Sequence, residues 1–314
     1  MSTPPRVSVL LPIYNGGKYL DAALASIAAQ TFRDFEVLAV DDHSTDDSAA
    51  IVQAWVAKDS RFRLLTNTGP NGLPYGLNFG LQQAVGTYVA RMDQDDLSRP
   101  TRLAQQVAFL DQHPKIALVG TGYLPFGPGR SGQAIHHPRR ATDLAWFCLT
   151  NTRFAHPSVM FRCAVIDAVG PYPIQEAEDF GFFSKVVQKF PTANLPEVLL
   201  EYREHGGNMS TVRREKIALG VAETFRRNFT AYQQSPAHLS IFYRFHAGRV
   251  VRVTDLPLIM RISWSILNAI RHAYHRPWYD PEWLGTVIMV KGLLLRAVTR
   301  SLLHLPSVVS ELPV

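Results

Sequence analysis

Gly86-Thr87-Tyr88-Val89-Ala90-Arg91-Met92-Asp93-Gln94-Asp95-Asp96 reads as a short β-strand that ends in three carboxylates. Residues i and i+2 of a strand lie on the same side, so Asp93 and Asp95 can point together into a crevice beyond the strand. In open α/β sheets such a crevice, at the carboxyl ends of the strands, is where ligands bind. Clustered carboxylates need a cation, and these oxygen ligands suit Mg²⁺ or Mn²⁺ carried with a diphosphate. The alternative is a solvated acidic turn that caps a helix over residues 100–112.

The chain on either side of this stretch alternates between strand and helix patterns. Apolar runs that stop at turn residues predict strands at 7–13, 35–40, 61–66, 116–119, 156–162 and 194–202. After the first strand, Leu20, Leu24 and Ile27 follow the i, i+4, i+7 spacing of a helix with one buried face. This alternation predicts an α/β fold with a mainly parallel central sheet. Residues 123–140, which are rich in Gly and Pro, are expected to form a loop.

The composition favours a folded protein in a reducing compartment. Hydrophobic residues make up 46% and charged residues 18% of the 314 positions, which argues against a disordered chain. The two cysteines, Cys148 and Cys163, imply no disulfide framework. The first residues lack the layout of a signal peptide, and no apolar run approaches the roughly 18 residues that span a bilayer. We therefore expect a cytoplasmic protein.

The last third of the chain is more basic than the rest. Residues 205–314 carry 14 Lys and Arg against six Asp and Glu, whereas the first 204 residues carry 18 against 20. A basic segment of this kind suits nucleic acid or an anionic membrane surface. We disfavour nucleic acid because no recognised binding motif accompanies the charge.

The same segment has a helical pattern. In residues 256–272 the polar side chains recur at i, i+4, i+7 and i+11 and leave a broad apolar face. One interpretation is that these helices pack on the α/β domain. The other is peripheral attachment to the inner face of the membrane, because basic amphipathic helices with Trp fit that pattern. The residues expected to touch lipid are Trp264, Trp283, Lys291, Arg296 and Arg300.

Four separated clusters stand in the order and spacing of a known family. They are Leu11-Pro12-Ile13-Tyr14-Asn15, Val40-Asp41-Asp42-His43-Ser44-Thr45-Asp46, Asp93-Gln94-Asp95-Asp96 and Glu178-Asp179. Together with residues 199–205 and Ser210, they make residues 5–210 resemble the family 2 glycosyltransferases. The resemblance implies a GT-A fold, a nucleotide-sugar donor, a divalent metal and inversion at the anomeric carbon. We expect a catalytic domain at 1–210 and a helical region at 211–314.

The resemblance also implies how single residues bind the donor. Pro12 and Tyr14 resemble positions that line the nucleotide base, with Asn15 beside them. Asp42 matches the acid that contacts the uracil edge, and Asp41 is its neighbour. The donor is therefore expected to be a UDP-sugar.

The implied metal site takes its ligands from the acidic turn and from the end of the domain. Asp93 looks like the position near the ribose, and Asp95 like the contact to the metal and the diphosphate. His205 matches a histidine near the metal, so Asp93, Asp95 and His205 are the expected set for Mn²⁺ or Mg²⁺. One departure is Leu77, where many relatives carry an arginine before the Asn. A polar contact near the donor is expected to be missing there.

The expected chemistry follows from the demands of sugar transfer. The leaving diphosphate must be neutralised, and the acceptor hydroxyl must lose a proton. Asp179 matches the family's catalytic base, and like-charge repulsion from Glu178 is expected to raise its pKa. The expected reaction moves a single sugar to a hydroxyl of a glycan or lipid-linked acceptor in surface polysaccharide biosynthesis.

Two other functions remain open at this point. A sugar nucleotidyltransferase would use a similar α/β fold, but a basic Gly-rich loop would be expected after the first strand, where this chain has Tyr14-Asn15-Gly16-Gly17. A non-catalytic scaffold that binds nucleotide-sugars is the third possibility. The presence of both Asp95 and Asp179 speaks against it.

Overall fold

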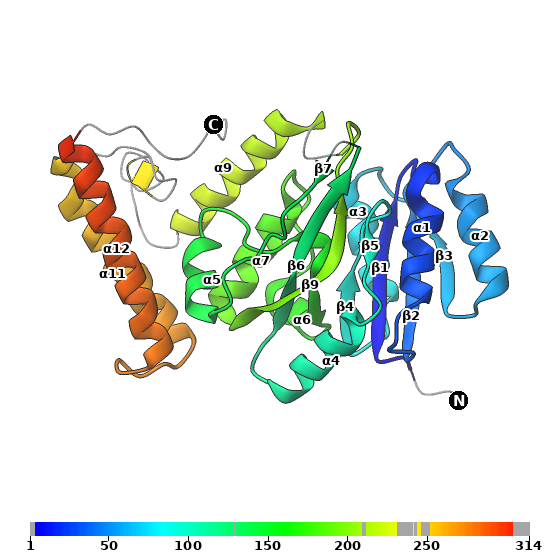
Figure 1. Ribbon diagram of the computed structural model, residues 1–314, viewed down its shortest axis with the longest axis horizontal. Helices are drawn as coiled ribbons and strands as arrows, with labels where there is room; N and C mark the ends of the chain where they lie inside the picture. Colours follow the sequence, from blue (N-terminus) through cyan, green and yellow to red (C-terminus); the bar gives the residue numbers. More distant parts are fainter. Residues whose placement is uncertain are drawn as a thin grey trace.

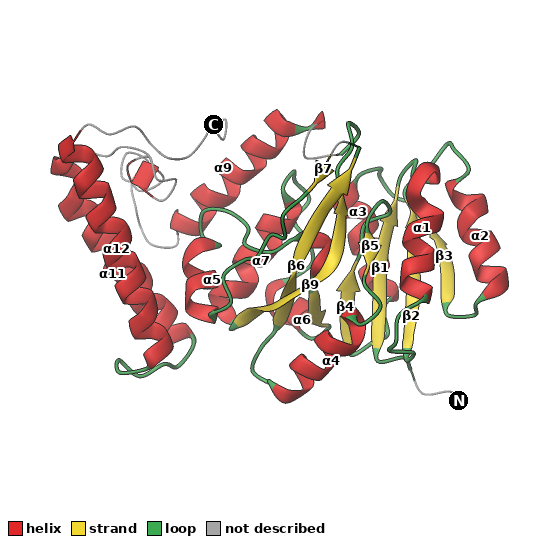
Figure 2. Ribbon diagram, viewed as in Figure 1, coloured by secondary structure: helices red, strands yellow, loops and turns green. Residues whose placement is uncertain are grey.

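The computed structural model describes residues 4–128, 130–208, 212–230, 241, 244–245 and 252–303. One mixed sheet forms the centre of this part of the chain, in the order β3-β2-β1-β4-β8-β6-β9-β5, with β7 paired to β6 (Figure 2). The strands are β1 Val7–Ile13, β2 Phe35–Asp41, β3 Phe62–Thr66, β4 Tyr88–Arg91, β5 Leu97–Ser98, β6 Leu118–Gly127, β7 Arg130–Ser131, β8 Met160–Arg162 and β9 Thr192–Arg203. The helices are α1 Gly17–Ala28, α2 Ser48–Lys58, α3 Leu73–Gln83, α4 Arg102–Gln112, α5 Ala141–Phe147, α6 Val165–Val169, α7 Glu178–Lys189, α9 Arg214–Thr230, α11 Leu256–Ala273 and α12 Pro281–Leu303, with short 3₁₀ turns at His156–Ser158 and Val253–Asp255.

The parallel half of the sheet consists of β3, β2, β1 and β4. All seven residues of β1 and of β2 are buried, because helices cover both faces of these strands. On one face Leu10 and Val40 belong to the same core as Leu77 of α3, and on the other Val9 lies in a core with Leu24 of α1. Alternate residues of a strand thus serve opposite layers. A Cβ at Gly80 would lie 2.3 Å from Leu10 Cδ1, so α3 can approach β1 this closely only with glycine there.

The second half of the sheet changes strand direction. β8 runs antiparallel to both β4 and β6, β9 runs parallel to β6, and β5 pairs antiparallel with β9. The prediction of an α/β fold with a mostly parallel sheet is therefore confirmed, with the antiparallel pairs as an addition. Through β9, residues near 200 lie beside the turn that follows β4.

Two predicted segments were wrong in detail. The strand expected at 156–162 is only Met160–Arg162, because His156–Ser158 forms a 3₁₀ turn that includes Pro157, which has no N–H to give to a sheet. Residues 123–140 are not simply a loop, since β6 continues to Gly127 by pairing with β9 and then with β7. The second difference depends on β9, a partner strand that is distant in the sequence.

The C-terminal helices pack on the α/β part of the chain. α11 and α12 lie side by side at the end of the molecule away from β3 (Figure 1). Ile259, Ile262 and Ile266 of α11 are buried in the core that also holds Trp146 of α5. Trp283 of α12 is 5% exposed, and its Nε1 donates to the Leu267 carbonyl at 3.2 Å. The expectation that Trp283 lies on a lipid-facing surface was therefore wrong.

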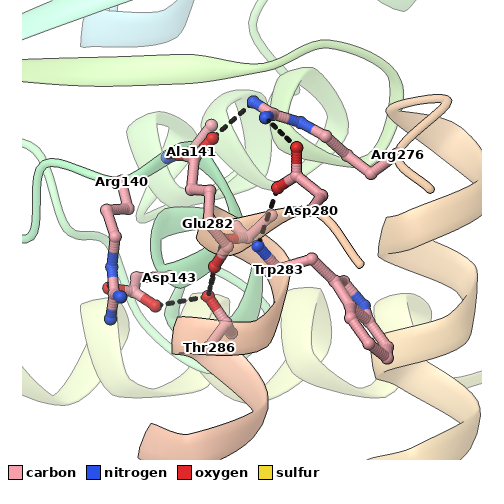
Figure 3. Close-up of polar contacts among 9 residues, drawn as sticks. Arg140, Ala141, Asp143, Arg276, Asp280, Glu282, Trp283 and Thr286 are labelled. Carbon is pink, nitrogen blue, oxygen red and sulfur yellow. Dashed lines mark hydrogen bonds and ion pairs between the residues drawn. The ribbon is translucent and has the colours of Figure 1, made fainter. Parts of the chain in front are cut away.

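Polar contacts fasten α12 to α5, and we call them the α5–α12 junction (Figure 3). Glu282 Oε1 accepts the Ala141 N–H at 2.7 Å, which occupies a free donor at the start of α5. Thr286 Oγ1 donates to Asp143 Oδ1 at 2.6 Å, and Arg276 pairs with Glu282. The helical pair is thus joined to the sheet domain by both apolar and polar contacts. Of the helices described, none is long and apolar enough to cross a membrane.

Candidate functional site

A cavity of about 620 Å³ opens at the carboxyl ends of β1, β2 and β4, where the end of β9 closes one side. This volume is ordinary for a small-molecule site. Most of the predicted donor-site and metal-site residues line it, namely Pro12, Tyr14, Asn15, Asp42, Asp93, Asp95 and His205. Parallel strands place these residues together because their carboxyl ends meet at one edge of the sheet.

Asp42 and Asp41 have different surroundings although they are adjacent. The carboxylate of Asp42 accepts from Asn67 Nδ2 at 2.6 Å and from the Gly72 N–H at 2.7 Å, and it reaches the cavity. Asp41 is the last residue of β2, is not among the residues that line the cavity, and accepts the Ser44 N–H at 3.3 Å. Asp42 therefore faces the cavity, whereas Asp41 supports the turn after β2.

Gln94 joins the end of β1 to the acidic turn, and the sequence analysis gave it no role. Its side-chain amide accepts the Tyr14 N–H at 2.9 Å and donates to the Tyr14 carbonyl at 3.0 Å. Asn15, at a positive φ of 48°, accepts the Thr45 N–H at 2.8 Å. The Tyr14 ring stays 52% exposed at the cavity, free to stack on a planar ligand.

Three carboxylates gather at the end of β4. Oxygens of Asp93, Asp95 and Asp96 lie within 4.8 Å of one another. Burial and the charge of Asp93 raise the pKa of Asp95, and burial with both neighbouring charges raises that of Asp96 well above its usual range. Asp96 is 1% exposed, and its Oδ2 has no hydrogen-bond partner within the described part of the chain. A divalent cation would satisfy that oxygen and neutralise the repulsion, so the residues fit Mg²⁺ or Mn²⁺.

The end of β9 holds this cluster from the other side. His205 Nε2 lies 2.9 Å from Asp95 Oδ2, so the fold brings this predicted metal residue beside the cluster. The Arg203 N–H donates to Asp96 Oδ1 at 2.8 Å, and its Nε donates to the Asp95 carbonyl at 2.7 Å. The Arg203 guanidinium also lies over the ring of Tyr19, 4.6 Å from its centroid. Arg203 belongs to residues 199–205, which carry part of the family resemblance, but the sequence did not predict it as a site residue. Ser210 lies outside the described residues.

Glu178 and Asp179 begin α7, and neither is among the residues that line the cavity. Burial, followed by the charge of Asp179, raises the pKa of Glu178 to about 8. Burial is also the main cause of the raised pKa of Asp179, and the repulsion on Asp179 comes from Asp93. The repulsion expected within the pair is thus expressed in the raised pKa of Glu178, whereas burial does most to raise the pKa of Asp179.

Two further residues surround this pair. His156 Nδ1 lies 3.7 Å from Glu178 Oε1, and its Nε2 is 3.1 Å from the Tyr172 hydroxyl. Burial and the nearby charge of Arg91 lower the pKa of His156 well below its usual range, so this ring is neutral. Asn78 exchanges two hydrogen bonds with the backbone of Tyr172, each at 2.9 Å. Leu77, the departure from the family pattern, is fully buried in the core and does not face the cavity.

Comparison with known proteins agrees with this geometry. "Putative glycosyltransferase EpsE" of Bacillus subtilis (strain 168) is 34% identical over 211 residues, which is 65% of this chain and 75% of EpsE. "O-antigen biosynthesis glycosyltransferase WbnJ" of Escherichia coli is 28% identical over 245 residues, or 76% of this chain and 94% of WbnJ.

Solved structures share the fold. S. aureus TarS 1–349 in complex with UDP-GlcNAc superposes with a TM-score of 0.61 at 22% identity, over 94% of this chain and 88% of TarS. The mannosyltransferase PcManGT of Pyrobaculum calidifontis, in complex with GDP-Man and Mn²⁺, gives 0.59 at 19% identity, over 96% and 88%. The fold is thus the GT-A fold. The model of the family "Glycosyl transferase family 2" matches residues 8–170, and the chain therefore belongs to that family of glycosyltransferases.

Proposed function

We propose that the protein transfers a single sugar, with inversion, from a UDP-sugar to a hydroxyl of a surface-glycan acceptor. One observation carries the proposal most directly: Asp93 and Asp95 of the three-carboxylate cluster line a nucleotide-sized cavity, and Asp96 Oδ2 has no hydrogen-bond partner within the described residues. The names of the relatives point the same way, because WbnJ is described as an enzyme of O-antigen biosynthesis.

We assign metal binding and removal of the acceptor proton to different side chains. Asp95 and Asp93, with His205 beside them, would hold the metal, which neutralises the diphosphate as it leaves. We assign the removal of the acceptor proton to Asp179, whose raised pKa makes the carboxylate a stronger base than an exposed aspartate. Glu178 holds its own proton and leaves Asp179 as the ionisable member of the pair at neutral pH. A single base opposite a single leaving group corresponds to direct displacement and inversion.

Donor identity can be tested by calorimetry. We expect UDP to bind more tightly with Mn²⁺ than in EDTA. We also expect it to bind more tightly than GDP or dTDP, because Asp42 and Tyr14, to which we assign contacts with the uracil base, line the cavity. Equal UDP affinity in Mn²⁺ and in EDTA would contradict the metal site. The fold does not determine which nucleotide the donor carries, since TarS is described with UDP-GlcNAc and PcManGT with GDP-Man. If GDP bound far more tightly than UDP, a GDP-sugar would replace the UDP-sugar as the assigned donor.

A sugar nucleotidyltransferase fits the turn after β1 less well. The Gly16 N–H donates to Ser48 Oγ at 2.9 Å, and the Gly17 N–H donates to Asp46 Oδ2 at 2.9 Å. The backbone N–H groups that a nucleotidyltransferase would use to bind phosphates are therefore already occupied by side chains at or just before the start of α2.

We also place the enzyme at the inner face of the membrane, where a lipid-linked acceptor would lie. Trp264 and Ile288 are 53% and 69% exposed on the outer sides of α11 and α12, with Lys291 and Arg296 exposed near them. The acidic side chains of residues 252–303 are each paired with an arginine. A basic apolar surface of this kind is attracted to anionic lipid, at roughly 1 kcal/mol per basic residue.

Vesicle flotation tests this placement. The full chain is expected to float with phosphatidylserine vesicles at low salt and to be released at high salt, because salt screens the attraction. Replacing Lys291 and Arg296 with Gln should weaken flotation, whereas the same change at Lys115 and Arg139, which are exposed on the catalytic part, should not. A full chain that stays in solution at low salt would show that the exposed helical surface has no role in lipid binding.

A further inference from the structure

We propose that Arg91 binds the sugar that is transferred and so helps to determine which UDP-sugar the enzyme accepts. The inference rests on the proposed function and adds a contact to the sugar itself. Arg91 is the last residue of β4, two positions before Asp93, and it is one of the residues that line the cavity. Two positions along a strand place the two side chains on the same side.

The backbone of Arg91 is fixed on both sides. Its N–H donates to the Val159 carbonyl at 2.9 Å, and its carbonyl accepts from Arg102 Nη2 at 2.5 Å. The side chain is only 3% exposed, and the cavity is where that exposed part lies. The guanidinium is therefore held in one place at the cavity wall and is shielded from bulk solvent.

The hydrogen-bonding capacity of this guanidinium is not used up. Nη1 lies 2.5 Å from Asp93 Oδ2 in an ion pair, whereas the buried Nε has no hydrogen-bond partner within the described residues. A buried arginine offers five N–H donors, and unsatisfied donors in a buried site are unfavourable. A ligand that supplies oxygen acceptors here would relieve this cost.

The position of Arg91 indicates which part of the donor would supply them. Its charge acts on Asp93, in the cluster assigned to the metal and diphosphate. The same positive charge also reaches Glu178 and Asp179, where it favours the ionised carboxylates. In a direct displacement, the transferred sugar lies between the leaving diphosphate and the base. Arg91 therefore faces the sugar, and hydroxyl oxygens of a pyranose are the acceptors that its N–H groups would bind.

A different role would be to hold Asp93 in place for the metal, and the two roles predict different binding data. If Arg91 binds the sugar, its removal weakens the binding of the UDP-sugar and spares the binding of UDP. If it only positions Asp93, both ligands lose affinity together, since both use the metal.

The experiment compares Arg91→Met, Arg91→Lys and the wild-type enzyme by calorimetry in Mn²⁺. The probes are UDP and whichever of UDP-GlcNAc, UDP-glucose and UDP-galactose binds the wild type most tightly. We expect Arg91→Met to weaken UDP-sugar binding about tenfold or more, the usual effect of losing charge-assisted hydrogen bonds, while UDP affinity changes less than about threefold. Arg91→Lys should fall between the two because it keeps the charge and loses the planar fork.

Arg162→Met provides the control. Arg162 pairs with Tyr88 at the other end of β4, donates from Nε to the Ile116 carbonyl at 2.9 Å and does not line the cavity. Its replacement should alter the melting temperature without changing the ratio of UDP-sugar to UDP affinity. Equal loss of both affinities in Arg91→Met, or no loss of either, would overturn the proposal. A wild type that binds GDP instead of UDP would refute only the assignment of uracil as the nucleotide base. The same comparison would then use GDP and GDP-mannose.

Discussion

Glu178→Gln should stabilise the protein, and by an amount that depends on pH. Glu178 is buried beside Asp179, and its pKa is raised from 4.5 to about 8. The folded protein therefore keeps this proton up to about pH 8, whereas the unfolded chain releases it near pH 4.5. Between these values unfolding releases a proton, so wild-type stability falls as the pH rises. Glutamine fills the same space and carries no ionisable proton.

The size of the effect follows from the pKa difference. Each pH unit above 4.5 costs the wild type about 1.36 kcal/mol until the folded-state pKa is reached. At pH 7 the free energy of unfolding of Glu178→Gln should therefore exceed that of the wild type by at most about 3 kcal/mol. Near pH 5 the difference should fall to about 0.8 kcal/mol, because this pH lies only about half a unit above the pKa at which the unfolded chain releases the proton.

Urea unfolding at pH 5, 6, 7 and 8, without added metal, measures this difference. Histidines that do not contact residue 178 titrate alike in both proteins, so their contribution cancels in the comparison. His156 does contact it, but burial and the charge of Arg91, which are present in both proteins, lower its pKa well below the usual range and keep its ring neutral. Glu197→Gln is the control, because Glu197 is exposed on β9 and its replacement should give a small difference that does not vary with pH. A Glu178→Gln difference that is the same at pH 5 and pH 8 would refute the argument that Glu178 keeps its proton in the folded protein.

Three further outcomes can be checked directly. Asp179→Asn should lower kcat by about 10²–10⁴ while UDP affinity in Mn²⁺ is kept, and near-normal turnover would show that the base lies elsewhere. Ile266→Ala, at a fully buried position of α11, should lower the free energy of unfolding by about 2–5 kcal/mol in a single transition, whereas a loss under about 1 kcal/mol would mean that α11 is not part of the common core. Thr286→Val should cost about 1–3 kcal/mol in denaturant unfolding because Asp143 Oδ1 loses its donor, and an unchanged midpoint would show that this bond of the α5–α12 junction adds no stability.

The features that the sequence predicted well are local ones. The apolar runs of β1 and β2 and the acidic turn after β4 were found because strand periodicity and turn residues act over a few positions. The partners of the acidic turn were missed for the opposite reason. Gln94 meets Tyr14 across 80 positions, and Arg203 meets the Asp95 carbonyl across 108. An Arg or Gln in a motif gives no local sign of the backbone group that it will bind.

The burial of Trp283 shows a second limit. The helical period correctly predicted that α11 has an apolar face. It could not tell whether protein or lipid covers that face, since α5, which supplies part of the covering, lies some 140 positions earlier in the chain. Glu178 is similar, because its raised pKa results first from burial by packed elements, which the sequence does not show, and only second from its acidic neighbour Asp179.

The place of β9 in the sheet has a consequence for synthesis of the protein on the ribosome. Asp95 emerges 110 residues before His205, an interval of roughly 6–22 s at about 5–20 residues per second. During that time the parallel strands β1 to β4 can pair, but the carboxylates at their ends have neither Arg203 nor His205 beside them. β5 cannot join the sheet either, because its partner is β9. A nascent chain stalled before residue 203 should therefore contain the parallel sheet yet fail to retain Mn²⁺ and UDP, which makes nucleotide binding a marker of complete translation of this domain.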